Sequence, residues 1–304
     1  MEMHDILKTI YQEVKPLASK GEVADYIPQL SFISPDKLAI SVHNVDGSCY
    51  EVGDSDTPFS IQSISKVFGY TLAFKVLGPD IWKRLDKEPS GNSFNSLVQL
   101  EYERGIPRNP FINAGAIVIA DIILSHYPNP QQTLLDFVRG ITNEPSIRYN
   151  HDVATSEKLT GYRNTALAYL MKSFKNIHNS VEDVLDFYFL QCSLEMSSKN
   201  LSKSFLYLAN HGIVPSTNEQ ILTVSQSKRI SALMLTCGLY NESGDFAYRV
   251  GMPAKSGVGG GVVAIIPKKL SICVWSPPLN RFGNSLAGIE ALEKFTTYTG
   301  DSIF

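Results

Sequence analysis

Ser63 and Lys66 are the two residues whose types and spacing most readily suggest chemistry in this sequence. Residues three positions apart lie side by side on one face of a helix. A lysine in apolar surroundings loses its proton more easily, because burial penalises the charged ammonium form. A neutral Lys66 can then accept the hydroxyl proton of Ser63 and turn it into a nucleophile. A serine and a lysine at this spacing also occur by chance in many chains, so the pair alone favours no enzyme.

The residues that follow Ser63 predict a buried helix. Apolar side chains continue to Leu77, and the pair Gly78-Pro79 then ends the pattern. Between Ser60 and Leu77 only Lys66 and Lys75 carry charge, and a helix that is apolar nearly all round is normally buried. The first backbone N–H groups of such a helix have no partner within it, so they can stabilise an oxyanion.

Composition places the chain among ordinary soluble globular proteins. It has 304 residues, of which 43% are hydrophobic and 19% charged, and its net charge is −3. The lysines and arginines are scattered along the chain, so nothing indicates binding to nucleic acid or to an anionic membrane. The first residues lack the pattern of an export signal, and no stretch is both long and apolar enough to span a bilayer. We therefore expect a cytoplasmic protein. Four dispersed cysteines predict buried free thiols in a reducing compartment: Cys49, Cys192, Cys237 and Cys273.

Periodicity predicts strands near both ends of the chain and helices between them. A hairpin is expected over 38–52 around an Asp46-Gly47 turn, and a second pair of strands over 262–266 and 270–275. Helices are expected at 3–19, 131–140, 163–175, 180–190, 198–210, 218–238 and 286–295, together with an apolar helix that follows the segment 108–117 and runs to about 124. Loops are expected at 90–96 and 156–164.

These elements predict a mixed α/β (α+β) fold. One antiparallel sheet would be built from both chain ends and flanked by helices, with a helical subdomain inserted in the middle. We expect a single catalytic domain over 1–304, with a sheet-bearing part at about 1–78 and 222–304 and a helical part at about 79–221.

A second motif supports the first. Lys255-Ser256-Gly257 begins a glycine run that leads into a strand, so it is not a phosphate-binding loop, which would precede a helix. The triplet is similar to the K-T-G strand that faces the serine in S-x-x-K acyl-transfer enzymes. Two such motifs in the right order favour acyl transfer more than either does alone.

Six blocks then carry a specific resemblance: 25–30, 60–66, 109–117, 208–212, 238–244 and 255–261. Over essentially its whole length the chain resembles a serine-dependent, bacterial-type glutaminase of the β-lactamase/penicillin-binding-protein-like superfamily. The resemblance implies a β-lactamase/DD-peptidase-like fold. It also implies hydrolysis of the side-chain amide of L-glutamine to L-glutamate and ammonia through a glutamyl-serine intermediate.

The resemblance also implies roles for individual residues. Ser63 would be the nucleophile and Lys66 its general base, while Tyr26 and Tyr240 would relay a proton to the leaving amine. The backbone amides of Ser63 and Val258 would form the oxyanion hole. The substrate-binding set would comprise Ser63, Asn113, Glu157, Asn164, Tyr188, Tyr240 and Val258.

Glutamine chemistry fits this set. Glu157 can pair with the α-ammonium group, and the two asparagines with Tyr188 can bind the α-carboxylate. For Tyr26, Glu157, Asn164 and Tyr188 a packing or surface role is the alternative. No metal or organic cofactor, nucleic acid or membrane partner is expected, and the family implies a homodimer or homotetramer.

Two other functions compete with this one. A D-alanyl-D-alanine peptidase or β-lactamase shares the S-x-x-K chemistry, but it works outside the cytoplasm and would form a stable adduct with penicillin. A binding protein that retains the fold without turnover is the third possibility, and the joint presence of the serine, lysine, tyrosine and glycine-rich strand argues against it.

Overall fold

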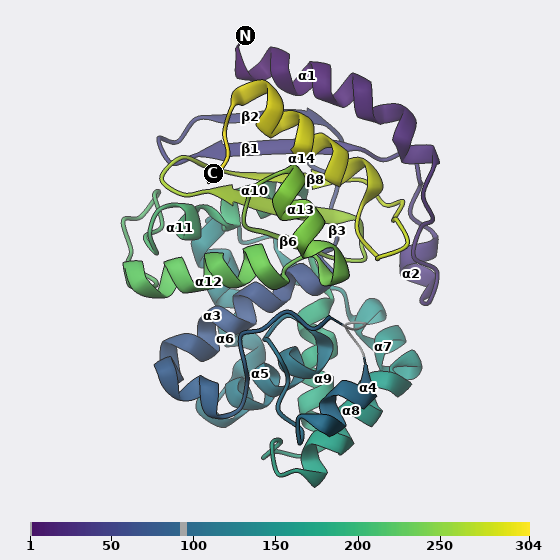
Figure 1. Ribbon diagram of the computed structural model, residues 1–304, viewed down its shortest axis with the longest axis vertical. Coiled ribbons are helices and arrows are strands. Elements are labelled where there is room, and N and C mark those ends of the chain that lie inside the picture. The colour runs from purple at the N-terminus through teal and green to yellow at the C-terminus, as the bar shows by residue number, and fades with distance from the viewer. Residues whose placement is uncertain (1, 92–95) are drawn as a thin grey trace.

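A five-stranded antiparallel sheet joins the two ends of the chain in the computed structural model, which describes residues 2–91 and 96–304. Its order is β2-β1-β8-β7-β6, formed by Cys49–Gly53, Ala39–Asn44, Leu270–Trp275, Gly261–Ile266 and Ala254–Ser256. Strand β1 pairs with β8, which brings residues 39–44 beside residues 270–275 (Figure 1). The predicted hairpin, the second pair of strands and the mixed α/β fold class are confirmed.

Helices cover both faces of this sheet. On one face α1 (Met3–Val14) and α14 (Leu286–Thr299) pack against each other and against the strands (Figure 1). On the other face lie α10 (Ser198–Ser204) and α11 (Leu206–Ala209). Every residue of β7 and β8 is consequently buried, which explains why apolar side chains predominate on both faces of these strands.

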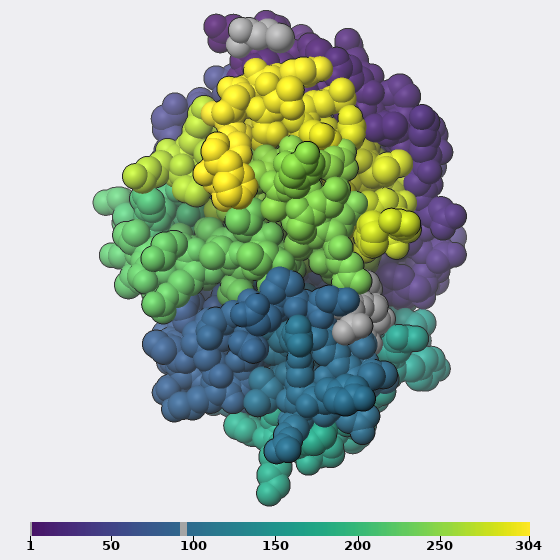
Figure 2. Space-filling model, in the orientation of Figure 1, coloured from purple at the N-terminus to yellow at the C-terminus, as the bar shows by residue number. Residues whose placement is uncertain are grey.

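The other half of the molecule is helical, and three helices form its centre. They are α3 (Ser65–Leu77), α5 (Asn113–His126) and α9 (Val181–Cys192), which contact one another. Figure 2 shows this half below the sheet-bearing half, with the two packed closely on the face in view. The remaining helices of this half are α4 (Leu97–Tyr102), α6 (Pro130–Thr142), α7 (His151–Thr160) and α8 (Tyr162–Ser173).

A second, smaller sheet and several further helices and turns complete the fold. A small sheet of order β3-β5-β4 is formed by Phe59–Ser60, Leu194–Met196 and Arg148–Tyr149. The other short elements and helices are η1 (Lys15–Ser19), α2 (Pro28–Ser31), η2 (Gln62–Ile64), η3 (Gly78–Lys83), α12 (Val224–Cys237), η4 (Tyr240–Glu242) and α13 (Ser243–Arg249). The proposed division into a sheet-bearing and a helical part stays a prediction.

Helix α3 is buried as its sequence predicts. All its residues from Ser65 to Phe74 are buried, Lys66 included, and the charged Lys75 is exposed. The helix ends at Leu77, before Gly78. No helix in the described part of the chain is both long and apolar enough to cross a membrane.

Several helix boundaries differ from the prediction, each for a local reason. The first α-helix stops at Val14, because Pro16 cannot donate a backbone hydrogen bond and a 3-10 turn follows. The predicted helix 198–210 is split at Phe205 into α10 and α11. The helix predicted from Asn218 begins at Val224, where Thr223 and Gln226 form a capping box.

Two further predictions were wrong. Residues 156–160, predicted as loop, belong to α7, which begins after Asn150 accepts hydrogen bonds from the N–H groups of Asp152 and Val153. Cys49 is exposed on the edge strand β2, whereas the other cysteines are buried as expected. Of the predicted loop 90–96, residues 92–95 lie outside the described part of the chain.

Gly115 fixes the distance between helix α5 and the segment that precedes it. A Cβ atom at this position would lie 1.9 Å from the backbone carbonyl oxygen of Asn109. Only glycine therefore lets residues 109–112 pass directly over the first turn of α5. Phe111 lies in this segment, and its carbonyl oxygen accepts a hydrogen bond from Lys66.

We predict that Gly115→Ala lowers the free energy of unfolding by about 1–3 kcal/mol, because the main chain of Asn109 must move away from the new methyl group. Chemical denaturation monitored by circular dichroism measures the change. Gly140→Ala is the matched control, since this helical glycine is exposed and has no atom within 4 Å of the new Cβ. The control variant should be stabilised by about 0.5–1 kcal/mol. Equal stabilities for the two variants would contradict the close approach.

Candidate active site

Ser63 lies in a strained turn at the boundary between the two halves of the molecule. It occupies the 3-10 turn η2, directly after β3 and directly before α3. The preceding residue, Gln62, has φ +50°, a left-handed conformation that costs a non-glycine residue about 1–2 kcal/mol. Its carbonyl oxygen accepts a hydrogen bond from Ser65 Oγ at 2.7 Å, and its side-chain Nε2 donates to Ser60 Oγ at 3.1 Å. These contacts hold the turn, and Ser63 remains half-buried.

Lys66 lies one turn further along and is 1% exposed. Its Nζ donates to Asn113 Oδ1 at 2.7 Å and to the Phe111 carbonyl oxygen at 3.2 Å. Both acceptors are neutral, and Lys66 forms no salt bridge with a carboxylate of the described chain. Burial therefore lowers the pKa of Lys66 to about 8.

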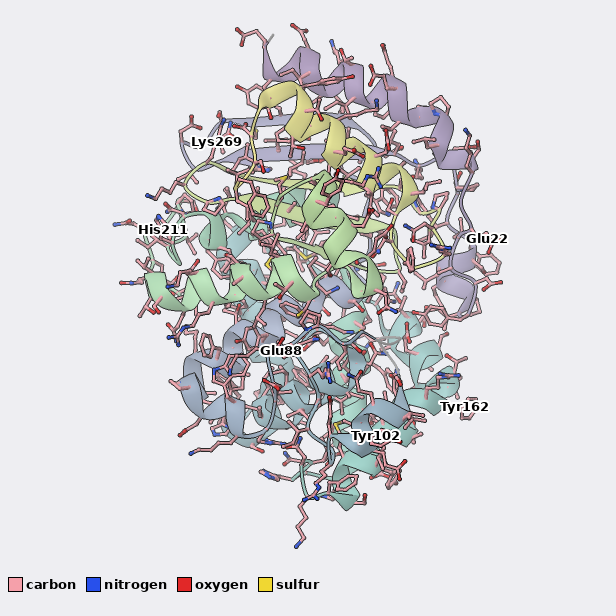
Figure 3. The ribbon with its side chains drawn as sticks, in the orientation of Figure 1. Glu22, Glu88, Tyr102, Tyr162, His211 and Lys269 are labelled. Atoms are coloured by element: carbon pink, nitrogen blue, oxygen red, sulfur yellow. The ribbon has the colours of Figure 1, made fainter. Side chains whose placement is uncertain are left out.

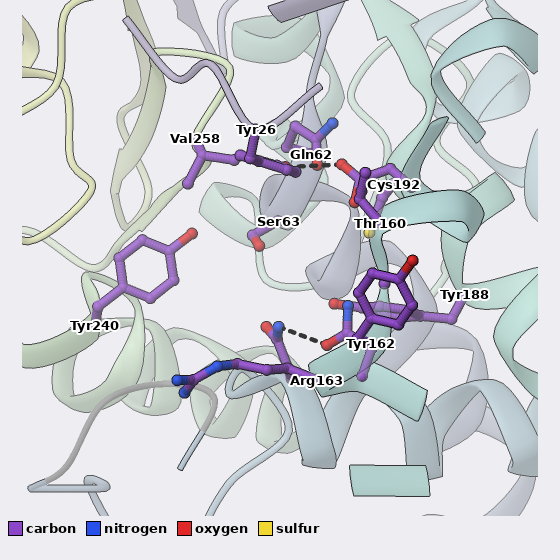
Figure 4. A pocket seen from close by; sticks show the side chains of 14 residues that line it. Tyr26, Gln62, Ser63, Thr160, Tyr162, Arg163, Tyr188, Cys192, Tyr240 and Val258 are labelled. Carbon is purple, nitrogen blue, oxygen red and sulfur yellow. Dashed lines mark hydrogen bonds between the residues drawn. The ribbon is translucent and has the colours of Figure 1, made fainter. Parts of the chain in front are cut away.

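A pocket of about 410 Å³ opens above these residues (Figure 4). Every residue predicted for the site lines it except Lys66, which lies buried beneath and bonds to the lining residue Asn113. The lining residues are Tyr26, Gln62, Ser63, Asn113, Glu157, Thr160, Gly161, Tyr162, Arg163, Asn164, Tyr188, Cys192, Tyr240 and Val258. Residues from distant parts of the sequence thus converge around Ser63.

One side of the pocket presents polar groups from the helical half. Asn113 at the start of α5 donates from Nδ2 to Asn164 Oδ1 of α8 at 2.9 Å, so it links Lys66 to the pocket wall. Glu157 of α7 is 7% exposed and accepts a hydrogen bond from the Tyr26 hydroxyl at 2.7 Å. Burial raises the pKa of Glu157, although hydrogen bonds and the nearby Lys66 oppose the shift.

Tyr240 faces Ser63 from the opposite side of the pocket (Figure 4). Burial raises the pKa of its hydroxyl to about 12, against the opposing effect of hydrogen bonds with Ser63 and Ser256. The Nζ of Lys255 lies 4.7 Å from the centre of the Tyr240 ring and donates to the carbonyl oxygens of Gly238 and Ser256 at 3.0 and 2.6 Å. Burial holds the pKa of Lys255 well below its ordinary value.

The glycine-rich turn between β6 and β7 lies directly against the Ser63 turn. A Cβ at Gly257 would be 2.5 Å from the Ile61 carbonyl oxygen and 3.3 Å from the backbone nitrogen of Ser63. Val258, the next residue of this turn, lines the pocket together with Ser63. The backbone of the glycine-rich turn and that of the Ser63 turn therefore meet at the pocket.

Some lining residues were not predicted from the sequence. Gln62 and Arg163 adjoin predicted residues, and their positions next to Ser63 and Asn164 were the available signal. Cys192 had no such signal, because its place in the pocket depends on the packing of α9 beside α3. The Cys192 thiol is fully buried, and this burial raises its pKa to about 12, so it stays protonated at neutral pH. The description of Cys192 as a buried free thiol is therefore confirmed, but its contact with the pocket was missed.

The fold and the site together define a class of protein. A serine followed at the third position by a buried lysine, beside an antiparallel sheet and at the edge of a helical half, is the arrangement of enzymes with the β-lactamase-like fold. The family model described as Glutaminase matches residues 21–304. A glutaminase of Aliarcobacter butzleri is 56% identical over the full length of both chains, and one of Vibrio cholerae is 55% identical over 99% of this chain and 98% of its own.

This chain therefore belongs to the glutaminase family and is an enzyme with glutaminase activity. Solved structures agree. A probable glutaminase, ybaS, superposes with a TM-score of 0.95 at 33% identity and covers 100% of this chain and 99% of its own. A Bacillus subtilis glutaminase in covalent complex with 5-oxo-L-norleucine, formed from 6-diazo-5-oxo-L-norleucine, has a TM-score of 0.90 at 33% identity, with full coverage of both chains.

Proposed function

We propose that this enzyme hydrolyses the side-chain amide of L-glutamine through a glutamyl ester of Ser63, with Lys66 as general base. The observation that carries the proposal is the environment of Lys66, a buried amine with neutral acceptors and a pKa of about 8, one helical turn from a serine at the floor of the pocket. A base with a pKa near the working pH is what proton abstraction from a hydroxyl needs.

The first half-reaction releases ammonia. Ser63 Oγ attacks the side-chain amide carbon, and its proton passes to the neutral Lys66. The negative charge on the carbonyl oxygen is stabilised by the backbone N–H groups of Ser63 and Val258. When the tetrahedral intermediate collapses, the carbon–nitrogen bond breaks, and the proton held by Lys66 reaches the departing nitrogen through Tyr240.

The second half-reaction regenerates the enzyme. A water molecule loses a proton to Lys66 and attacks the ester carbon, and the proton returns to Ser63 Oγ as glutamate leaves. The overall reaction consumes one water and one glutamine and yields glutamate and ammonia.

Substrate recognition follows from the charges around the pocket. The buried Glu157 supplies a negative charge for the α-ammonium group of glutamine, while Asn113, Asn164 and Tyr188 supply polar groups for its α-carboxylate. The Tyr26 hydroxyl donates to Glu157, so it supports this carboxylate directly, and its part in proton relay stays a prediction. The homodimeric or homotetrameric state and the cytoplasmic location also stay predictions.

Ser63→Ala should abolish glutamate release from glutamine, because the variant lacks the hydroxyl that forms the proposed ester. Glutamate production by the purified variant measures this, with circular dichroism as the check of folding. Ser31→Ala, which removes an exposed serine hydroxyl on α2, is the matched control and should retain full activity. Undiminished glutaminase activity in the Ser63 variant would rule out the proposed mechanism.

The rate should rise with pH as Lys66 loses its proton. Because burial lowers the pKa of Lys66 to about 8, the neutral amine makes up about 1% of the enzyme at pH 6 and about 90% at pH 9. We therefore expect kcat to increase steeply between these values and to level off above them. Initial rates at saturating glutamine measure the profile. A rate that does not change over this range would exclude Lys66 as the base.

A further inference from the structure

Tyr240 holds a backbone conformation that needs external support. It begins the short 3-10 turn η4 with φ +52°, in the left-handed region that bulky residues rarely adopt. Such a conformation costs about 1–3 kcal/mol and persists only where surrounding structure imposes it. The ring of Tyr240 nevertheless has to be placed accurately, because its hydroxyl faces Ser63 (Figure 4).

Glu242, at the end of the same turn, is held by hydrogen bonds to a neighbouring loop. Its side chain is buried, with the residue 8% exposed, and it forms no salt bridge with a cation of the described chain. Its carboxylate instead accepts hydrogen bonds from Asn280 Nδ2, at 3.0 and 2.8 Å to the two oxygens, and from Asn284 Nδ2 at 2.6 Å. Asn284 Nδ2 also lies 3.3 Å from the Leu239 carbonyl oxygen, just before Tyr240. The turn is thus tied to residues 279–285, which we call the asparagine loop.

The asparagine loop is itself closed by internal hydrogen bonds. Asn280 Oδ1 accepts from the N–H groups of Phe282 and Asn284 at 2.9 and 3.2 Å, and the Asn280 N–H donates to the Asn284 carbonyl oxygen at 2.8 Å. One end of the loop pairs through Leu279 with Glu22, which Figure 3 labels on the segment between α1 and α2. The other end, Ser285, caps helix α14.

The same loop approaches the reacting groups. A Cβ added at Gly283 would lie 3.8 Å from Tyr240 Cε2 and 3.8 Å from Val258 Cγ1, so the loop passes close to both residues. We propose that Glu242, through Asn280 and Asn284, is a positioning residue that fixes Tyr240 for proton transfer at Ser63. This inference rests on the proposed function, because it assumes the role given there to Tyr240.

The proposal makes a kinetic prediction that differs from a loss of stability. Glu242→Gln keeps the shape of the side chain but replaces one acceptor oxygen with a donor that faces the amide donors of the loop. We expect kcat/KM for glutamine to fall by about 10- to 100-fold, as is typical when a reacting group is displaced by about 1 Å. Asn280→Asp removes the donor to Glu242, keeps the oxygen that closes the loop, and should give a similar loss.

A double-mutant cycle with Tyr240→Phe separates positioning from general destabilisation. If Glu242 acts through the Tyr240 hydroxyl, Glu242→Gln should change kcat/KM less than about twofold in the Tyr240→Phe background. Thermal unfolding of each variant establishes that the protein is folded at the assay temperature. Asp245→Asn is the matched control, since this exposed acid on α13 contacts Arg249 at 3.6 Å, and it should leave the rate unchanged.

Each outcome of these rate measurements supports or contradicts either the positioning role of Glu242 or the proton relay through Tyr240. An equal loss from Glu242→Gln with and without the Tyr240 hydroxyl overturns the positioning role, as does a wild-type rate for a folded Glu242→Gln enzyme. A wild-type rate for Tyr240→Phe would instead refute the proton relay in the proposed function. A large loss from Glu242→Gln in the wild-type background that is absent in the Tyr240→Phe background supports the inference.

Discussion

The desolvated amine of Lys66 is the constraint on which the rest of the site depends. Removing an ammonium group from water is costly unless a carboxylate lies beside it, and here the direct partners are the neutral oxygens of Phe111 and Asn113. The amine is consequently poised between its two protonation states near pH 8. That balance requires helix α5 and the segment before it to lie tightly on α3, which explains the close approach at Gly115.

The two halves of the molecule contribute different things to the pocket. The helical half buries Lys66 and presents Glu157 and the two asparagines, so it supplies the proposed base and the groups suited to an amino acid. The sheet-bearing half brings the glycine-rich turn and Tyr240 to Ser63 from the other side. Ser63 lies where they meet, in a strained turn that is followed immediately by the rigid helix α3.

The sequence was most informative where the physical signal was local. Alternating and continuous apolar runs predicted the strands, and the apolar run after Ser63 predicted a buried helix, because these patterns follow directly from burial. Helix α7 was missed because it shows no apolar stripe, and only its residues Val153 and Glu157 are buried. The contacts of Cys192 and Glu242 were missed because they depend on tertiary packing. Resemblance, rather than pattern, indicated Tyr188 and Asn164 as site residues, and the structure places both in the pocket.

We propose that Ser63 forms the covalent bond to the substrate. The most direct measurement is to incubate the enzyme with 6-diazo-5-oxo-L-norleucine, an electrophilic glutamine analogue, and to map the label by peptide mass spectrometry. We expect one label per chain, on the peptide that contains Ser63, and no label on the folded Ser63→Ala enzyme. A label on Cys192, which also lines the pocket, or unchanged labelling of the Ser63→Ala variant, would contradict it.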